Sequence, residues 1–116
     1  MIDKKEWDEA EAEAQQGADV YIHKFAKPFT YEGKTYEELT FDFGKLTGND
    51  YLAIEEECQA LGRIVVTPTL SGNFLARMAA RACCEKIGSD LLMATPIADF
   101  SRIRSKARSF LLKTEL

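Results

Sequence analysis

The sequence predicts an α+β fold, mostly helical, in which an N-terminal β-hairpin or small antiparallel sheet precedes about three main α-helices. Two patterns lead to this prediction. Large apolar residues alternate with others early in the chain, as in strands, and recur at spacings of three and four after residue 47, as in helices. The chain has 116 residues, enough for one domain and too few for two ordinary ones. We therefore expect an acidic N-terminal arm over residues 1–19 and a single domain over residues 20–116.

The composition of the arm sets it apart from the rest of the chain. Three of its glutamates alternate with alanines, namely Glu9, Glu11 and Glu13. Alanine and glutamate favour helix, yet the only large apolar anchors in the arm are Ile2 and Trp7. This composition is compatible both with a loosely attached helix and with a disordered arm.

The first part of the predicted domain carries the signals of a hairpin. Alternation over residues 20–25 predicts a short strand with large residues on both faces. Pro28 restricts the next stretch to a sheet edge or a strand start, because proline donates no backbone hydrogen bond. Residues 32–33, Glu-Gly, predict a two-residue turn into a return strand over residues 34–43. Tyr36 and Leu39 would lie on opposite faces of a regular strand, so we expect a bulge near residues 37–38.

Two helices are predicted after the hairpin. Residues 47–50 resemble a capping box, which predicts a helix over residues 51–61 that ends at Gly62. A longer helix is predicted over residues 72–87, where small residues indicate close approach to another helix. The apolar positions are Tyr51, Ile54, Cys58 and Leu61 in the first helix, and Phe74, Leu75, Met78, Ala79, Ala82 and Cys83 in the second.

A short helical turn over residues 89–93 precedes the last predicted helix. Thr95 and Pro96 form a typical helix start, and we expect this helix to run to about Lys113. Its amphipathic pattern is the most regular in the chain, with apolar residues at Ile97, Phe100, Ile103, Ala107, Phe110 and Leu111. Its other face is basic, with Arg102, Arg104, Lys106, Arg108 and Lys113.

Charge is unevenly distributed along the chain. Residues 1–57 carry 15 acidic and 6 basic residues, whereas residues 58–116 carry 4 acidic and 9 basic ones. Such asymmetry is compatible with head-to-tail self-association or with an oppositely charged partner, and also with two solvated charged faces. The basic face of the last helix is able to contact nucleic-acid phosphates, but a pI near 5.0 disfavours nucleic-acid binding.

Residue chemistry indicates a protein without catalytic machinery. The chain has one histidine, His23, and no nucleophile–base pair, metal-ligand cluster or phosphate-binding loop is recognisable, so we expect no enzyme activity, cofactor or metal. The three cysteines, Cys58, Cys83 and Cys84, are interpreted as free, buried thiols. Without a hydrophobic signal core or an apolar run near the roughly 20 residues of a membrane span, we expect a cytosolic protein without membrane contact.

Four segments carry a family resemblance through their order and spacing. They are residues 29–41 (FTYEGKTYEELTF), residues 45–48 with Asp50 (KLTG and D), residues 78–82 (MAARA), and residues 98–100 (ADF) leading to residues 109–111 (SFL). Together they resemble the tail assembly chaperones of long-tailed bacteriophages and prophages, in their short form. The resemblance covers roughly residues 21–112 and leaves out the acidic arm.

The resemblance implies a non-enzymatic role in the cytoplasm of a host bacterium. Such chaperones bind the tape measure protein and keep it soluble until tail tube subunits polymerise around it. The tail tube protein and further copies of the chain are additional candidate partners. Two alternatives stay open: a structural virion component such as a head–tail connector or tail terminator, and a small nucleic-acid-binding regulator.

Three consecutive apolar residues of the last helix are the candidate partner-binding residues. Phe110, Leu111 and Leu112 cannot all face one core, which leaves apolar surface for a client protein. The alternative is that they pack on the hairpin and on the preceding helix.

Overall fold

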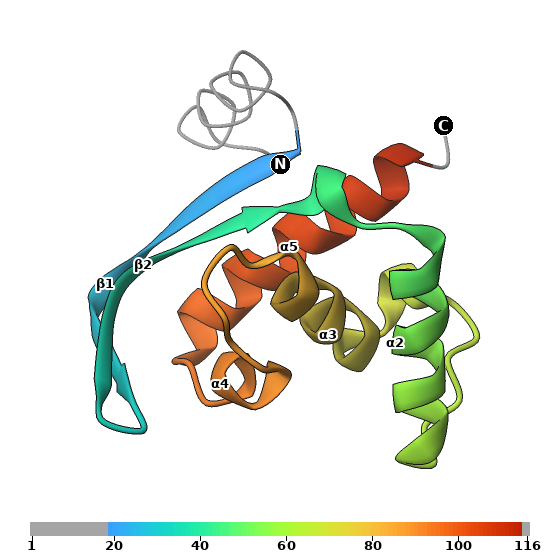
Figure 1. Ribbon diagram of the computed structural model, residues 1–116, viewed down its shortest axis with the longest axis horizontal. Coiled ribbons are helices and arrows are strands. Elements are labelled where there is room, and N and C mark those ends of the chain that lie inside the picture. Colours follow the sequence, from blue (N-terminus) through green and yellow to red (C-terminus); the bar gives the residue numbers. More distant parts are fainter. Residues whose placement is uncertain (1–18, 115–116) are drawn as a thin grey trace.

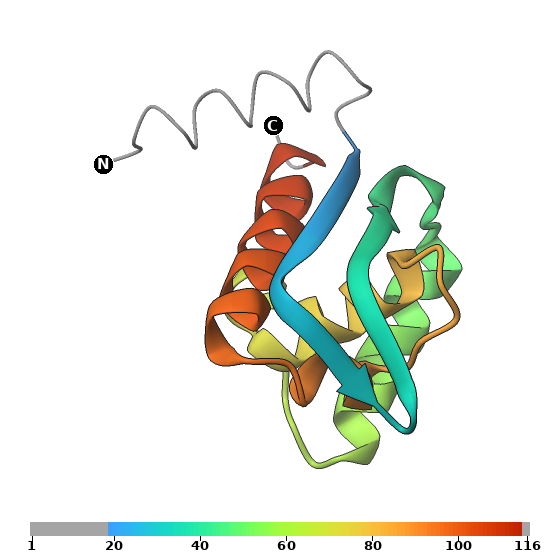
Figure 2. The same cartoon turned by 90° about the vertical axis from the view of Figure 1, so that its left-hand side faces the viewer.

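The computed structural model describes residues 19–114, in which a long bent hairpin lies along one side of a group of helices (Figures 1 and 2). This architecture confirms the predicted α+β class. Apart from Asp19, the acidic arm lies outside the described residues. The elements are, in order, β1 (Val20–Tyr31), β2 (Lys34–Asp42), the 3-10 turn η1 (Phe43–Lys45), α2 (Gly48–Ala60), the 3-10 turn η2 (Pro68–Leu70), α3 (Gly72–Ala82), α4 (Ser89–Met93) and α5 (Ile97–Thr114).

The hairpin turns where the sequence predicts it. β1 and β2 are antiparallel, and positive φ angles at Glu32 (48°) and Gly33 (78°) reverse the chain between them. The predicted bulge lies on the other strand. Lys24 pairs with Glu38 and Phe29 with Tyr36, so four residues of β1 stand opposite one residue of β2. The extra β1 residues include Pro28, which cannot donate to a ladder, and β1 continues past this proline instead of ending before it.

The helix α3 lies at the centre of the core. The Ser71 hydroxyl caps its start by accepting a hydrogen bond from the Phe74 amide at 3.1 Å. The helix packs against α2, α4, α5 and β2. Its buried residues are Phe74, Leu75, Ala76, Met78, Ala79 and Ala82. β2 and η1 contribute the buried residues Leu39, Phe41 and Phe43.

The predicted end of the second helix is wrong. We expected helix to residue 87, but α3 ends at Ala82 because the next residues pair with β2. Cys83 forms an isolated antiparallel β-bridge with Phe41, and the Cys84 amide donates a hydrogen bond to the Thr40 carbonyl at 2.8 Å. The Thr40 amide in turn donates to the Glu85 carboxylate at 3.0 Å. These contacts satisfy backbone groups of β2 that a continuing helix would leave open.

The ends of two amphipathic stripes extend beyond the core. Ile54 and Cys58 of α2 are buried as predicted, but Leu61 is exposed and Tyr51 is only partly covered. Ile97 at the start of α5 is 86% exposed, whereas Ile103, Ala107 and Leu111 of that helix are buried. The predicted burial of Cys84 is also wrong, since it is exposed while Cys58 and Cys83 are buried. The partly covered Tyr51 still contacts Phe74 of α3, with ring centroids 5.0 Å apart.

A chain of two hydrogen bonds joins β1 to α5, and the one between His23 and Asp99 is buried. The Tyr21 hydroxyl lies 2.8 Å from Nδ1 of His23, and His23 Nε2 lies 2.8 Å from Oδ1 of Asp99. A neutral imidazole with its proton on Nε2 satisfies both contacts, because Nδ1 then accepts from tyrosine and Nε2 donates to the carboxylate. Burial lowers the pKa of His23 below 6.5, and this effect outweighs the hydrogen bond and the charge of Asp99, which raise the pKa.

The lowered pKa of His23 predicts a loss of stability in mild acid. The unfolded chain binds a proton near pH 6.5 whereas the folded protein resists it, so the free energy of unfolding should fall as pH drops from 7 towards 5. The slope cannot exceed about 1.4 kcal/mol per pH unit for one proton. Urea unfolding at several pH values measures it. A His23→Gln variant, which is less stable at pH 7, should lose most of this slope, and an unchanged slope would contradict the assignment.

The three thiols should differ in reactivity. Burial, with the hydrogen bond to Glu85, raises the pKa of Cys83 to about 12, and burial raises the pKa of Cys58 as well. Because the thiolate is the reactive form, we expect a disulfide reagent to modify one thiol rapidly in the folded protein, and all three after unfolding. Cys84→Ser should abolish the rapid phase. Two rapid thiols in the native protein would show that the packing of β2 on residues 83–85 is wrong.

Candidate functional site

A groove of about 340 Å³ opens between the start of α2 and the last turns of α5, which lie at the same end of the molecule (Figure 1). Most of its lining is apolar. The residues are Leu46, Thr47, Gly48, Asp50, Tyr51, Ile54, Met78, Phe110, Leu111 and Thr114. They come from the link between η1 and α2, from α2 itself, from α3 and from α5. The groove is thus a tertiary feature that no single element contains.

Local sequence fixes the first turn of α2 at the edge of this groove. Thr47 precedes the helix with extended backbone, and its amide donates a hydrogen bond to Oδ2 of Asp50 at 2.8 Å. The Thr47 hydroxyl also lies 3.2 Å from that oxygen. The Asp50 carboxylate therefore satisfies groups that precede the helix, as the predicted capping box requires. The helix begins at Gly48, three residues before the predicted start.

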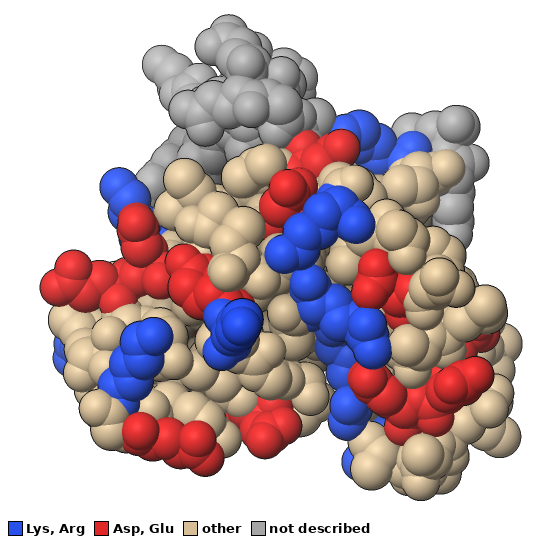
Figure 3. Space-filling model, in the orientation of Figure 1, with Lys and Arg blue, Asp and Glu red and all other residues tan. Residues whose placement is uncertain are grey.

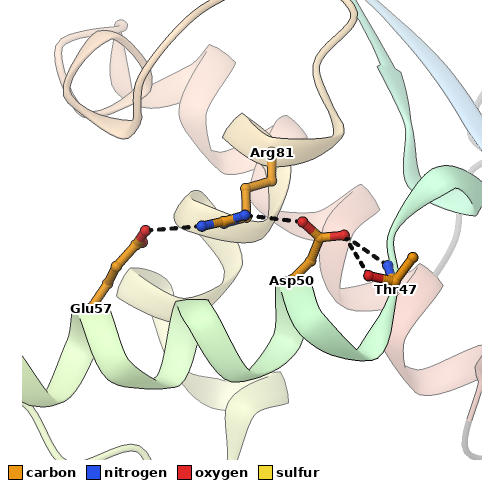
Figure 4. Close-up of polar contacts among 4 residues, drawn as sticks. All are labelled: Thr47, Asp50, Glu57 and Arg81. Atoms are coloured by element: carbon orange, nitrogen blue, oxygen red, sulfur yellow. Dashed lines mark hydrogen bonds and ion pairs between the residues drawn. The ribbon is translucent and has the colours of Figure 1, made fainter.

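Arg81 of α3 ties α2 to the centre of the fold (Figure 4). Its Nη1 lies 3.0 Å from Oδ1 of Asp50, and its Nη2 lies 3.3 Å from Oε1 of Glu57, about two turns further along α2. Arg77 adds a 3.4 Å contact to the same glutamate. The Thr47 amide, followed by Arg81, lowers the pKa of Asp50 below its usual value. Partly exposed pairs of this kind contribute about 0.2–1 kcal/mol each, so their main effect is to orient α2.

Acidic and basic side chains also alternate across one face of the molecular surface. On the face drawn in Figure 3, basic side chains form a column with acidic side chains on both sides.

Within residues 19–114, no group of three or more histidine, cysteine or acidic residues is arranged to hold a metal ion. In the same part of the chain, no helix combines the length and apolar composition that crossing a membrane requires.

The three candidate partner-binding residues occupy different environments. Phe110 is half-buried and stacks on Phe43, with ring centroids 5.4 Å apart. Leu111 is 7% exposed and belongs to the core, whereas Leu112 is 40% exposed. Phe110 and Leu111 line the groove and Leu112 does not. Phe110 and Leu111 therefore pack against other parts of the fold. The apolar surface predicted for the three residues is part of a groove that other elements also line.

Sequence reasoning missed most of the groove, including Leu46 and Met78, because nothing in the sequence brings residues 46, 78 and 110 together. One signal was present. Seven of the ten lining residues fall within three of the four segments that carry the family resemblance: Leu46, Thr47, Gly48, Asp50, Met78, Phe110 and Leu111.

No protein-family model matches the chain, and neither a curated protein nor a solved structure is significantly similar to it. The groove therefore has to be interpreted from its own geometry and from the sequence pattern.

The predicted basic face of the last helix is divided between two sides of α5. Lys106 lies over the Tyr21 ring at 5.3 Å, and Lys113 pairs with Asp19 at 2.9 Å, so both face the β1 side. Arg104 lies near Gly72 at the start of α3, on another side. Arg108 is exposed. Lys106 and Lys113 therefore lie on a different side of α5 from Arg104, so the predicted basic face is not one continuous surface.

Neighbouring leucines of α5 should differ sharply in their contribution to stability. Leu111→Ala removes a core side chain and should lower the free energy of unfolding by about 2–3 kcal/mol, whereas Leu112→Ala should cost about 0.5 kcal/mol or less. Chemical denaturation of the two variants makes the comparison, with Leu112→Ala as the matched control. Equal losses would mean that α5 is rotated relative to the core.

Proposed function

We propose that this chain is a phage tail assembly chaperone that binds the tape measure protein in the host cytoplasm, and that the groove between α2 and α5 holds the client. One observation carries the proposal. The segments that resemble such chaperones are spread over residues 29–111 of the chain, yet three of the four contribute to one apolar groove. Segments that characterise a binding family are expected to meet at the surface that binds.

The chemistry of the groove favours apolar side chains of a helical client. Leu46, Ile54 and Met78 provide aliphatic surface, and Tyr51 and Phe110 add aromatic walls. A groove of this kind accepts residues spaced three or four apart on an amphipathic helix, as in other helix-in-groove complexes. The tape measure protein is a long helical client with many such positions. Contact with the tail tube protein is a separate prediction of the resemblance.

Charged substitutions at the rim of the groove test the proposal. Gly48→Glu is suited because a Cβ there meets no atom within 4 Å and an acidic residue is favoured at a helix N-terminus. Thr114→Glu places a charge at the opposite rim, and Ser105→Glu is the matched control on an exposed side of α5. We expect the two rim variants to bind the client about tenfold more weakly, which corresponds to about 1.4 kcal/mol.

The measurement is co-expression with the tape measure protein of the same phage, scored by that protein's soluble fraction and by its co-purification with this chain. If the unaltered chain leaves the client insoluble, the chaperone function is wrong. If the unaltered chain works and both rim variants work equally well, only the assignment of the groove is wrong. Unfolding temperatures of all variants show that each remains folded.

A further readout separates the proposal from its structural rival. A chaperone is released before the tail is complete, so this chain should be missing from purified virions of its phage. Mass spectrometry of those particles measures its abundance. A stoichiometric amount in the virion would instead support a head–tail connector or tail terminator.

A further inference from the structure

The loop that connects α2 to η2 carries the two most exposed large apolar side chains of residues 19–114. Ile64 and Val66 are each 87% exposed, and Leu61 and Leu70 on either side of them are more than half exposed. The loop lies on the opposite side of the molecule from the hairpin (Figure 1). None of these four residues lines the groove between α2 and α5. Apolar side chains that are exposed together in one short segment mark an interaction site more often than isolated ones do.

The backbone of this loop is also without partners between two fixed ends. At one end the Arg63 amide donates a hydrogen bond to the Cys58 carbonyl at 2.9 Å. At the other end the Thr67 carbonyl accepts one from the Leu70 amide at 3.0 Å. Between these points, the amides and carbonyls of residues 64–66 form no hydrogen bond with any other part of the chain that the structure describes. A row of free backbone groups of this kind is a template for pairing with another extended segment.

The loop is complementary to a second copy of itself. In an antiparallel pair centred on Val65, Ile64 of each copy lies opposite Val66 of the other. The hydrogen bonds of these two residue pairs use amide and carbonyl groups that are free in the single chain. The pairs also place β-branched apolar side chains side by side, which stabilises antiparallel strands. The chain bends at Val66, ahead of Pro68, so the pairing is limited to about three residues in each copy.

The distribution of charge favours a second copy in the antiparallel direction. Arg63 is the single charged residue among residues 61–70, whereas residues 55–57 of α2 are three consecutive glutamates. Antiparallel pairing sets Arg63 opposite Thr67, so the two arginines lie about 13 Å apart, which is four residues at about 3.4 Å each. This separation exceeds the Debye length of about 10 Å at about 0.1 M salt, whereas parallel pairing would put the arginines directly opposite each other. The loop therefore gives two chains of net charge −4 an almost uncharged place to meet.

We propose that two copies of this chain associate through residues 63–67, which pair antiparallel about a two-fold axis at Val65. Both copies use the same surface, so the contact is closed and association stops at the dimer. Because few residues pair, the interface is small and the dimer forms reversibly, with a dissociation constant between about 1 μM and 1 mM. The residues that line the groove are not part of this contact, so the proposal does not depend on the identity of a client.

Sedimentation equilibrium of the full chain, at concentrations that span this range, measures the association. The average mass should rise from one chain towards two and then level off. Ile64→Lys removes an apolar contact of the pair and adds a charge beside Arg63, so it should weaken the dimer at least about tenfold. Ile97→Lys is the matched control, because Ile97 at the start of α5 is 86% exposed and the change in charge is the same. Near-ultraviolet circular dichroism checks that both variants are folded.

Cross-linking tests the register of the pair. Cys84→Ser first removes the exposed native thiol, and Ile64→Cys and Val66→Cys are then made separately in that background. A short thiol-reactive cross-linker should join the two variants to each other more efficiently than it joins either variant to itself, because residue 64 of one copy lies opposite residue 66 of the other.

Four outcomes would overturn the proposal. A mass that stays at one chain over the whole range would show that the loop does not bind a second copy, and binding of a client that Ile64→Lys abolishes would then assign the loop to that client. A mass that keeps rising beyond two chains would show that the loop binds a different surface of the next copy. Equal weakening by Ile97→Lys would show that the loop is not the interface. Cross-linking of each variant mainly to itself would show that the register is wrong.

Discussion

The burial of α3 is the constraint on which the remaining structure depends. Its alanines, such as Ala79 and Ala82, are fully buried and let neighbouring backbones approach closely, while Phe74 and Leu75 fill the space between them. α2, α4, α5 and β2 all pack on this one helix. Loss of a buried aromatic side chain costs about 3–5 kcal/mol, which is a large part of the stability of a domain of this size. The hairpin supplies one wall of this core and would have no independent stability without it.

The same helix also determines the geometry of the groove. Met78 contributes to its lining, while Arg77 and Arg81 on the outer side of α3 hold the acidic side of α2. One helix thus supplies both apolar contact and the charges that orient the opposing wall. This arrangement explains why a mostly apolar groove sits beside a dense set of ion pairs. Ion pairs orient the wall that α2 forms, whereas most of the groove lining is apolar.

Features that depend on neighbours in the sequence could be predicted, and features that depend on distant contacts could not. The turn at Gly33 and the start of α3 at Gly72, which Ser71 caps, follow from local chemistry, and both lie where the sequence predicts them. The end of α3 depends on a backbone hydrogen bond between Cys84 and Thr40, 44 positions apart, and no local signal reports it. The groove could not be predicted from the sequence either, because it also depends on contacts between residues far apart in the chain. Its apolar residues come from separate segments, and periodicity assigns such residues to the core without showing which of them border open space.

Few buried contacts hold α2 to the rest of the fold, and this affects the width of the groove. Within the described residues this helix buries only Ile54 and Cys58, and its other links to α3 are partly exposed: the ring of Tyr51 against Phe74, and the ion pairs with Arg81. Elements held by few buried contacts open locally at a lower free energy than the whole fold requires. One wall of the groove is therefore compliant while the opposite wall, formed by α5, is anchored through Ile103, Ala107 and Leu111. A groove with one yielding wall accommodates side chains of different sizes along a repetitive helix, which a rigid pocket would select against.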